Sequence, residues 1–453
     1  MKETWRAACL VGCLMMSCSL RAQEEEAQGQ QNAAGAELPT EPTGDIDFSA
    51  PDVSDSATED SDFSAKASRV TLVHEGSYGE PGVVNNRSWF RVEYSKFFWN
   101  NFFVQVDSKL NMYWRKDHRA EAEDKTVLFD PNTPEAFLQY SAAGGRTSIK
   151  LGQQKLIWGE SEAGAITDEV SPRDLSELFF IPLEESRRGQ LMAVLDHFAP
   201  SGDGTAFFVP DPKFNRYAAP GTSYYIDPFA VGARGRDESS DQHYEYGMRW
   251  KRAFNSSDIS LMAADLIDND YAYRQEGVTD DGQPLIARLQ QRFTMVGGAF
   301  NLARGKFLFK GEIAYKFPKA FNDAAFEIVE KDVLDSALGL TYSLGQSNTL
   351  GFEIVNRYVH GWSSEIVSVP RNTSSLVLKA NLFFFNEDLT VNWLAIYERP
   401  YDSYQSSLRT SYEWTDNLIS SIDIHLVDVP SARSSLYPYR DKDQIVLRLQ
   451  YQF

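Results

Sequence analysis

The stretch Gln444-Ile-Val-Leu-Arg-Leu-Gln-Tyr-Gln-Phe453 alternates large apolar residues with mostly polar ones over ten positions. Successive side chains of a β-strand point to opposite faces, so one face of this segment is apolar and the other is polar. A period of two residues predicts a strand and argues against a helix, whose apolar residues would recur every three or four positions. The apolar face carries Ile445, Leu447, Leu449, Tyr451 and Phe453.

The same alternation recurs upstream, from about residue 69 onward. In residues 102–114 one face reads Phe, Val, Val, Ser, Leu, Met, Trp, and the other reads Phe, Gln, Asp, Lys, Asn, Tyr. A soluble β-sandwich also alternates, but many of these segments run nine to thirteen residues, which is the length that a tilted strand needs to cross a bilayer. Tryptophans lie at the segment ends, where interfacial girdles form in membrane barrels. They are Trp99, Trp114, Trp250, Trp393 and Trp414.

The connections between the segments alternate in length. Every second one is short, as at Asn100-Asn101, Gly144-Gly145 and Arg304-Gly305. Outer-membrane barrels combine short periplasmic turns with long external loops, and an even strand count brings both termini to the periplasm. We therefore predict an all-β fold, a single transmembrane antiparallel β-barrel over residues 67–453. Strands are expected near 69–74, 88–98, 102–115, 135–142, 146–157, 189–198, 204–209, 243–254, 257–267, 288–303, 306–317, 332–344, 348–359, 372–385, 389–398, 405–415, 419–427 and 443–453.

This assignment gives eighteen strands. Sixteen remains open, because the alternation is weak in residues 69–74 and 204–209.

The residues before the barrel predict export. Residues 1–22 combine a short basic region with an apolar segment and a small residue at Ala22, as signal peptides do. The three cysteines lie at positions 9, 13 and 18, so the mature chain would have none; lipidation at Cys13 stays an alternative. Residues 23–66 are acidic and poor in apolar residues, which predicts a disordered periplasmic linker. A solvated spacer is favoured over a docking strip for a basic partner.

Charge and hydropathy exclude several classes of protein. The net charge is −20, but twelve acidic residues with no Lys or Arg fall in residues 23–65, so the barrel is only mildly acidic. The acidic balance and the absence of a basic run disfavour nucleic-acid binding. After residue 22 no stretch approaches the ~18 apolar residues of a transmembrane helix. We expect no cofactor and no metal site.

Residues 150–160 and 167–175 carry the most distinctive motifs, with Gly152-Gln-Gln154 leading into Trp158-Gly-Glu160 and then Pro172-Arg-Asp-Leu175. This pattern resembles an uncharacterised porin-like outer-membrane β-barrel family, a domain of unknown function. The resemblance implies a pore-like barrel, sometimes associated with export of hydrophobic or envelope compounds alongside an inner-membrane transporter. The final strand also resembles the C-terminal signature that the outer-membrane assembly machinery recognises, so Phe453 is expected to contact that machinery.

Residues 159–188 are too long and too charged for a turn, and Pro172 suits the start of a short helix. Either this loop folds into the barrel and narrows it, or it is a solvated external loop. We predict channel-lining or constriction residues in the loop and on the inward strand faces. They are Glu160, Asp168, Arg173, Asp174, Arg187 and Arg188, with Asp107, Lys109, Arg249, Lys310, Glu312, Arg357, Arg409 and Arg448.

The predicted function is a porin-like channel for passive or partner-assisted passage of small solutes across the outer membrane, in contact with its lipids and lipopolysaccharide. The alternative is a surface ligand-binding or adhesin barrel that uses long loops such as residues 210–242, with Tyr217, Tyr224, Tyr225 and Phe229. We do not expect an enzyme. Ser421, Asp423 and His425 share a strand face, but three such positions span roughly 13 Å, too far for a catalytic triad.

Overall fold

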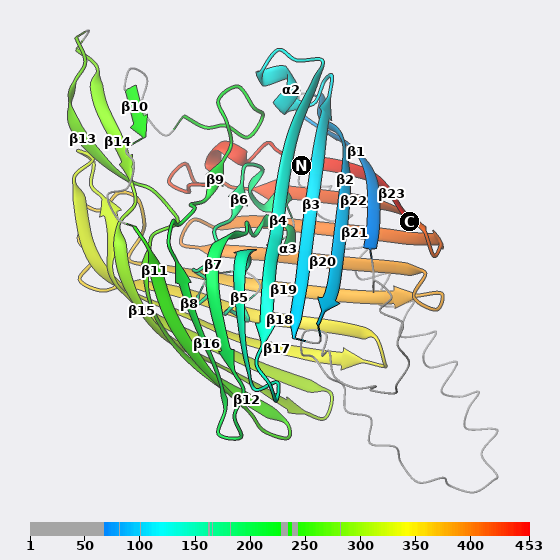
Figure 1. The fold of residues 1–453 in the computed structure, drawn as a ribbon. Coiled ribbons are helices and arrows are strands. Elements are labelled where there is room, and N and C mark those ends of the chain that lie inside the picture. The colour runs from blue at the N-terminus through cyan, green and yellow to red at the C-terminus, as the bar shows by residue number, and fades with distance from the viewer. Residues whose placement is uncertain are drawn as a thin grey trace, which may run out of the picture. The chain divides into compact units, whose positions relative to one another are not determined.

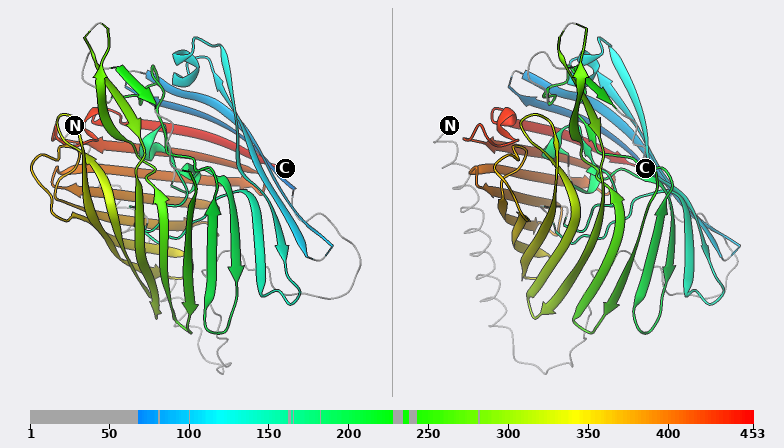
Figure 2. Two further views of the ribbon diagram at one scale, coloured as in Figure 1. Left: turned by 60° about the vertical axis from the view of Figure 1, so that its left-hand side comes forward. Right: turned by 90° about the vertical axis from the view of Figure 1, so that its left-hand side faces the viewer.

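The computed structural model describes residues 68–453 except 81, 100, 162–163, 165, 182, 228–233, 238–242 and 281. The predicted signal segment and acidic linker lie outside the described residues. Eighteen strands form one antiparallel sheet in which each strand pairs with its neighbours along the chain (Figure 1). The first strand, β1 (Ser68–Gly79), also pairs with the last, β23 (Gln444–Gln452), so the sheet closes into a barrel (Figure 2).

The eighteen-strand prediction is confirmed, and both weak segments are strands of the barrel: residues 69–74 belong to β1, and residues 204–209 belong to β8. The other strands are β2 (Gly82–Phe98), β3 (Phe102–Trp114), β4 (Val127–Ser141), β5 (Thr147–Gln154), β7 (Gln190–His197), β8 (Asp203–Val209), β11 (Glu245–Ala253), β12 (Ser257–Ile267), β15 (Arg292–Arg304), β16 (Phe307–Asn322), β17 (Ile328–Leu344), β18 (Asn348–Val359), β19 (Asn372–Phe384), β20 (Leu389–Arg399), β21 (Ser403–Thr415) and β22 (Leu418–Asp428).

Several strands are longer than predicted, β1, β2 and β4 most of all. β4 begins at Val127 instead of near residue 135, because the sheet accommodates Pro131 and Pro134 with a shift of register against β3 between Asp107 and Lys109. Prolines lack the amide donor of the ladder and interrupt the sequence pattern of a strand. β1 and β2 also extend until Gly79 lies opposite Gly82, so a connection that was expected to be long is a tight turn.

The outer face of the barrel is apolar. On β23 the outward side chains of Ile445, Leu447 and Leu449 are about half exposed, while Val446 between them is buried on the inner side. Large exposed apolar side chains recur in this way on strands all around the barrel. Such a surface suits the hydrocarbon of a bilayer, in the way predicted for a transmembrane barrel.

The long connections carry small elements of their own: α2 (His118–Ala122), β6 (Asp174–Leu175), η1 (Leu178–Phe180), α3 (Leu183–Ser186), β9 (Arg216–Tyr217), β10 (Arg234–Asp237), β13 (Ala272–Val278), β14 (Pro284–Leu289) and η2 (Tyr437–Tyr439). The helix expected to start at Pro172 is not formed. The chain is extended here instead: the backbone of Arg173 forms an isolated antiparallel β-bridge with that of Arg187, and β6 pairs in parallel with β9. None of the described helices is long and apolar enough to cross a membrane.

Candidate functional site in the barrel lumen

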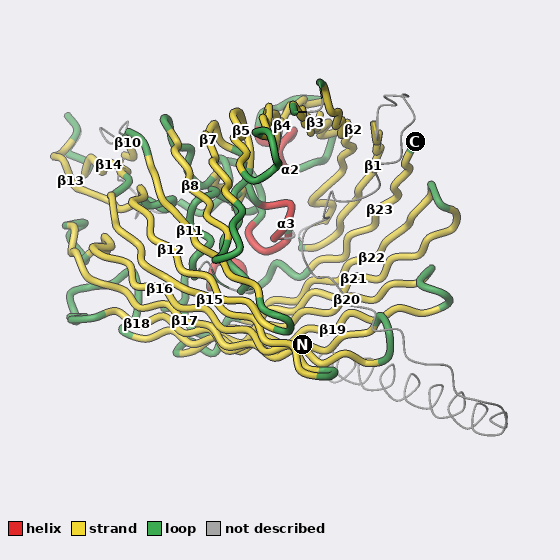
Figure 3. The backbone as a smooth tube through the Cα atoms, turned by 60° about the horizontal axis from the view of Figure 1, so that its bottom comes forward, coloured by secondary structure: helices red, strands yellow, loops and turns green. Residues whose placement is uncertain are grey.

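Residues 155–189, here called the inward loop, connect β5 to β7, and their described part lies within the ring of strands (Figure 3). Trp158 of this loop is 2% exposed, and its ring meets that of Phe207 on β8 edge-on, with centroids 5.2 Å apart. Ile166 and Val170 of the loop are buried in the same apolar cluster. Its other members come from the inner faces of β7, β8, β12, β15, β16 and β17: Met192, Val194, Phe207, Val209, Met262, Ala264, Leu266, Phe293, Met295, Ala314 and Ala337.

The part of the inner wall formed by these strands is thus an apolar platform on which the inward loop packs. Burying a large side chain of this kind stabilises the docked loop by about 2 to 3 kcal/mol. Of the two sequence interpretations of residues 159–188, the structure therefore supports a loop folded into the barrel.

Glu312 on β16 fixes the first part of the inward loop. Its Oε2 accepts hydrogen bonds from the backbone amides of Glu160 at 2.8 Å and Ser161 at 2.9 Å. Its Oε1 accepts from the amide of Thr167 at 2.7 Å and from the Thr167 hydroxyl at 2.6 Å. A buried carboxylate with four donors is well satisfied, and it holds backbone groups that would otherwise be unpaired in the lumen. Glu312 therefore acts as an anchor for the loop.

Asp168 ties the middle of the inward loop to its C-terminal end. Its Oδ2 lies 2.9 Å from the Arg187 guanidinium and 3.3 Å from that of Arg173. Arg187 is 9% exposed, so this predicted constriction charge is buried within the loop instead of facing the passage.

Glu169 joins the loop to three wall strands through alternating charges. The Lys316 ammonium on β16 lies 2.5 Å from Glu169 and 2.7 Å from Asp335 on β17. Asp335 in turn accepts two hydrogen bonds from Arg357 on β18, at 2.7 and 2.9 Å. Burial alone would raise the pKa of Glu169, but Lys316 and Lys319 outweigh it and hold the pKa below its usual range. Glu169 therefore stays ionised.

Glu177 makes the corresponding contact on the other side of the lumen. Its two oxygens accept from the Arg87 guanidinium on β2 at 2.5 and 2.7 Å, and Arg119 lies 3.4 Å away. His118 Nε2 lies 3.5 Å from the same carboxylate. Burial acts to raise the pKa of Glu177, but the facing Arg87 holds it well below its usual range. The inward loop thus spans the lumen, from the apolar platform to β2.

The wall behind Glu177 is a chain of ion pairs across neighbouring strands. Arg87 lies 2.7 Å from Glu75, and Arg409 lies 2.8 Å from Asp423. Arg448 pairs with both Glu75 and Asp423 and so links the two. On β2 and β3, Arg91 lies 2.7 Å from Asp107, which is 3% exposed. Opposite charges alternate along this wall, so most of them neutralise one another.

Two further long loops close over the inward loop. Tyr224, in the connection between β8 and β11, is 2% exposed and donates a hydrogen bond to Gln444 on β23 at 2.9 Å. Tyr439, in the connection before β23, donates to the Tyr224 carbonyl at 3.2 Å. Of the other aromatic residues named for the adhesin alternative, Tyr217 is exposed, Tyr225 is partly exposed, and Phe229 lies outside the described residues. Tyr224 is therefore part of the filling of the barrel mouth.

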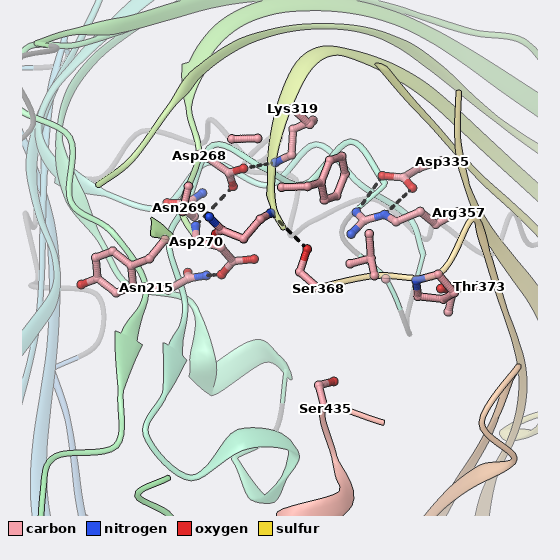
Figure 4. Close-up of a pocket in the computed structure, with 18 of the residues that line it drawn as sticks. Asn215, Asp268, Asn269, Asp270, Lys319, Asp335, Arg357, Ser368, Thr373 and Ser435 are labelled. Carbon is pink, nitrogen blue, oxygen red and sulfur yellow. Dashed lines mark hydrogen bonds and ion pairs between the residues drawn. The ribbon is translucent and has the colours of Figure 1, made fainter. Parts of the chain in front are cut away.

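A cavity of about 720 Å³ remains between the inward loop and β16 to β20 (Figure 4). Asp335 beside Arg357 and Asp268 beside Lys319 lie on its wall, and Ser435 reaches it from the connection before β23. Asp168 and Arg173 line it as well. A smaller cavity of about 90 Å³ lies against β1 to β4, and its lining includes Lys109, Asp174 and Arg448.

The remaining predicted residues are placed as follows. Lys310 lines a narrow space with Glu160 and Glu353. Arg188 donates a hydrogen bond at 2.7 Å to the carbonyl of Phe214, which lies in the connection between β8 and β11. Arg249 faces inward on β11, and its Nε donates no hydrogen bond to the part of the chain that is described. Asp423 pairs with Arg409 and Arg448, while His425 packs edge-on against Phe180, so Ser421, Asp423 and His425 do not form a triad.

Several residues that position the loop were not predicted from the sequence. Glu169 and Glu177 lie in the charged loop but were not singled out, and Arg87 lies one residue before the predicted strand 88–98. A signal for the apolar platform was present: residues 259–267 of β12 read Ile-Ser-Leu-Met-Ala-Ala-Asp-Leu-Ile, with apolar residues on both faces. A strand that is apolar on both faces is covered on both.

A family model described as "Protein of unknown function (DUF1302)" matches residues 14–398. The chain belongs to the DUF1302 family. The family resemblance that the Trp158-Gly-Glu160 region suggested is thereby confirmed. None of the curated proteins compared with this DUF1302 chain matches it.

Two solved structures have a similar fold. OccAB2 of Acinetobacter baumannii superposes with a TM-score of 0.50 and 11% identity, covering 85% of the DUF1302 chain and 97% of its own. The outer membrane protein opdK from Pseudomonas aeruginosa gives a TM-score of 0.50 and 10% identity, covering 85% and 98%. At this identity the likeness establishes the porin-like barrel fold alone.

Proposed function

We propose that this DUF1302 protein is a porin-like channel through which small water-soluble molecules diffuse across the outer membrane. A barrel of 18 strands is wide enough to leave an aqueous passage. The observation that carries the proposal is the cavity of about 720 Å³, with charged and hydroxyl side chains in its lining, that remains inside the barrel beside the docked loop. The outer-membrane proteins of similar fold support the same location for this chain.

The inward loop sets the width of the passage in this proposal. It is held at the apolar platform, at Glu312 and at Arg87, so it acts as a fixed constriction. Solutes that pass the inward loop meet the charged side chains that line the cavities. Those on the proposed route include Glu160, Asp168, Arg173, Asp174, Lys109, Lys310, Arg357 and Arg448.

Planar-bilayer recording tests the channel. Purified protein should insert with stepwise increases of current, and heat-denatured protein in the same detergent should give none. Glu312→Gln supplies a second readout, because it removes acceptor capacity from the loop anchor and should raise the conductance or its noise. The matched control is Glu413→Gln, an exposed residue on the inner face of β21. Repeated insertions without current above background would exclude the channel.

We further propose that the short turns face the periplasm and that the apolar outer face contacts lipid and lipopolysaccharide. The burial of Tyr224 does not favour the adhesin alternative, since a ligand-capturing loop would present its aromatic side chains to solvent.

A further inference from the structure

The cavity of about 720 Å³, here called the vestibule, differs from the ion-paired wall in its charge balance. Carboxylates outnumber basic side chains in its lining. Four of them are neutralised: Asp168 by Arg187 and Arg173, Asp268 by Lys319 at 2.5 Å, and Glu169 and Asp335 by the Lys316 and Arg357 network. The charges that remain therefore decide which solutes the vestibule favours.

Three carboxylates of the vestibule form no ion pair with a described residue, although Arg357 acts on one of them, Glu398, at longer range: Asp270, Asp323 and Glu398. Asp270 accepts hydrogen bonds from Asn215 and from the Tyr217 hydroxyl, which leaves its charge in place. Asp323 accepts hydrogen bonds from the backbone amides of Ala325 and Glu327, both at 2.8 Å. Among the basic residues of the lining, the exposed Arg433 is the one that forms no ion pair with a described residue.

Asp168 adds an independent observation. Its side chain is 4% exposed and lines the vestibule, and both arginines approach the same oxygen, Oδ2. Oδ1 accepts no hydrogen bond from any described group. A buried carboxylate oxygen without a donor is costly, and a ligand that carries an O–H or N–H donor, such as the hydroxyl of choline, would satisfy it.

Aromatic rings stand beside these carboxylates. Tyr273 and Phe326 both line the vestibule, with their rings edge-on and centroids 6.3 Å apart. Tyr271 and Tyr401 contribute two further rings. Aromatic faces attract ammonium groups through their quadrupole, and they do so in combination with nearby carboxylates.

We infer that the vestibule binds small organic cations, with an ammonium group held by the uncompensated carboxylates and the aromatic rings. This inference rests on the proposed channel function for its role, which is to select cationic solutes before they reach the constriction. The cavity has the volume of a small-molecule site. Glu398 on β20 is the residue whose loss should matter most, since it lines the vestibule from the wall and forms no ion pair with the described residues.

Titration calorimetry on the detergent-solubilised barrel, with choline chloride as the probe, tests the inference without requiring current. Wild-type protein should bind choline, and Glu398→Gln and Asp270→Asn should each weaken binding about tenfold, or about 1.4 kcal/mol. Glu413→Gln is the control, because it removes an inward carboxylate outside the vestibule and should bind as wild type does.

Choline binding that is absent, or that is unchanged in Glu398→Gln and Asp270→Asn, would overturn the inference. Equal weakening in Glu413→Gln would also overturn it, since the effect would then be one of general charge. Bilayer recording separates this from the channel proposal. If the protein conducts but does not bind choline, the channel proposal stands and the vestibule site is excluded. If it binds choline but does not conduct, the vestibule site stands and the channel is excluded.

Discussion

Arg87 of β2 and Glu177 of the inward loop form a bidentate ion pair, with nitrogen–oxygen distances of 2.5 and 2.7 Å. Glu177 is 1% exposed and the Arg87 side chain 13%, so the pair is largely shielded from water. The inward loop is thus attached at two sides of the lumen: at Trp158, on the apolar platform, and at Glu177, against Arg87 of β2. A loop fastened at both sides of the lumen can define a constriction, whereas a loop fastened at one side would swing.

Replacing Glu177 with glutamine tests this fastening. The change leaves Arg87 and Arg119 facing a neutral group, and removing one partner of a buried pair costs about 3 to 5 kcal/mol. We expect a lower thermal midpoint, larger current fluctuations and a shift of the reversal potential toward anions in a salt gradient. Glu185→Gln is the control, since Glu185 is an exposed residue of the same loop. Currents as quiet as those of wild type would show that Arg87 does not restrain the loop.

The acid response of the loop follows from the same carboxylates. Glu169 and Glu177 have a lowered pKa in the folded protein, relative to an ordinary value of 4.5. A carboxyl with a lowered pKa contributes stability that is fully present above its unfolded pKa and is lost as the pH falls through the folded pKa. Loop docking should therefore be constant from neutral pH to about 5 and should weaken only below about 4.

Hydrogen exchange of peptides from residues 166–186, corrected for intrinsic rates, measures this response. Protection should fall at acid pH in wild type, and in Glu177→Gln it should already be lower at neutral pH and change less. Loss of protection between pH 8 and 6 would contradict the assignment to these two carboxylates.

The strands were predictable because each depends on a local pattern of alternating side chains, and the ion pairs were not, because they depend on register between distant segments. Glu75 and Arg448 are 373 residues apart and meet only when β1 pairs with β23. Phe102 to Trp114 identifies its own inner face, but nothing in that segment indicates that Asp107 faces Arg91.

The inward loop shows the same limit. Its motif could be recognised, and its charges marked it as more than a turn. Its direction, however, is decided by Trp158, which finds a partner in Phe207 some fifty residues later. The apolar inner faces of β12 and β15 indicated that some segment covers them. The sequence does not show that this segment is the inward loop, whose apolar residues are buried in the same cluster.

Trp158→Ala should therefore undock the loop more than any change of surface charge. Removing a fully buried aromatic side chain costs about 3 to 5 kcal/mol. We expect a lower thermal unfolding midpoint by circular dichroism and faster cleavage of the inward loop by added protease. Trp99→Ala is matched in chemistry but changes a residue that is 83% exposed, and it should have little effect. Equal effects of the two variants would remove Trp158 as the anchor.

A disulfide can report whether the loop moves during conduction. The three cysteines of the chain lie at positions 9, 13 and 18, so an introduced pair in the barrel has no competitor there. A Cβ at Gly164 would lie 3.2 Å from Cγ1 of Val355 on β18. Gly164→Cys with Val355→Cys should crosslink on oxidation. If the loop is a fixed constriction, conductance should be the same before and after reduction, and a rise on reduction would indicate a loop that opens.

Phe453→Ser separates assembly from stability. The Phe453 side chain is 69% exposed and packs mainly against Tyr451, although its backbone amide donates to the Val70 carbonyl at 2.9 Å. The substitution keeps that backbone bond, so the folded barrel should lose less than about 1 kcal/mol. If the assembly machinery reads this aromatic residue, the variant should be depleted from the outer membrane of cells while refolding normally in detergent. Phe385→Ser, at an equally exposed position in a short turn, should reach the membrane as wild type does. Depletion of both variants to the same extent would mean that exposed aromatic residues matter for insertion in general, and that Phe453 has no special role in recognition.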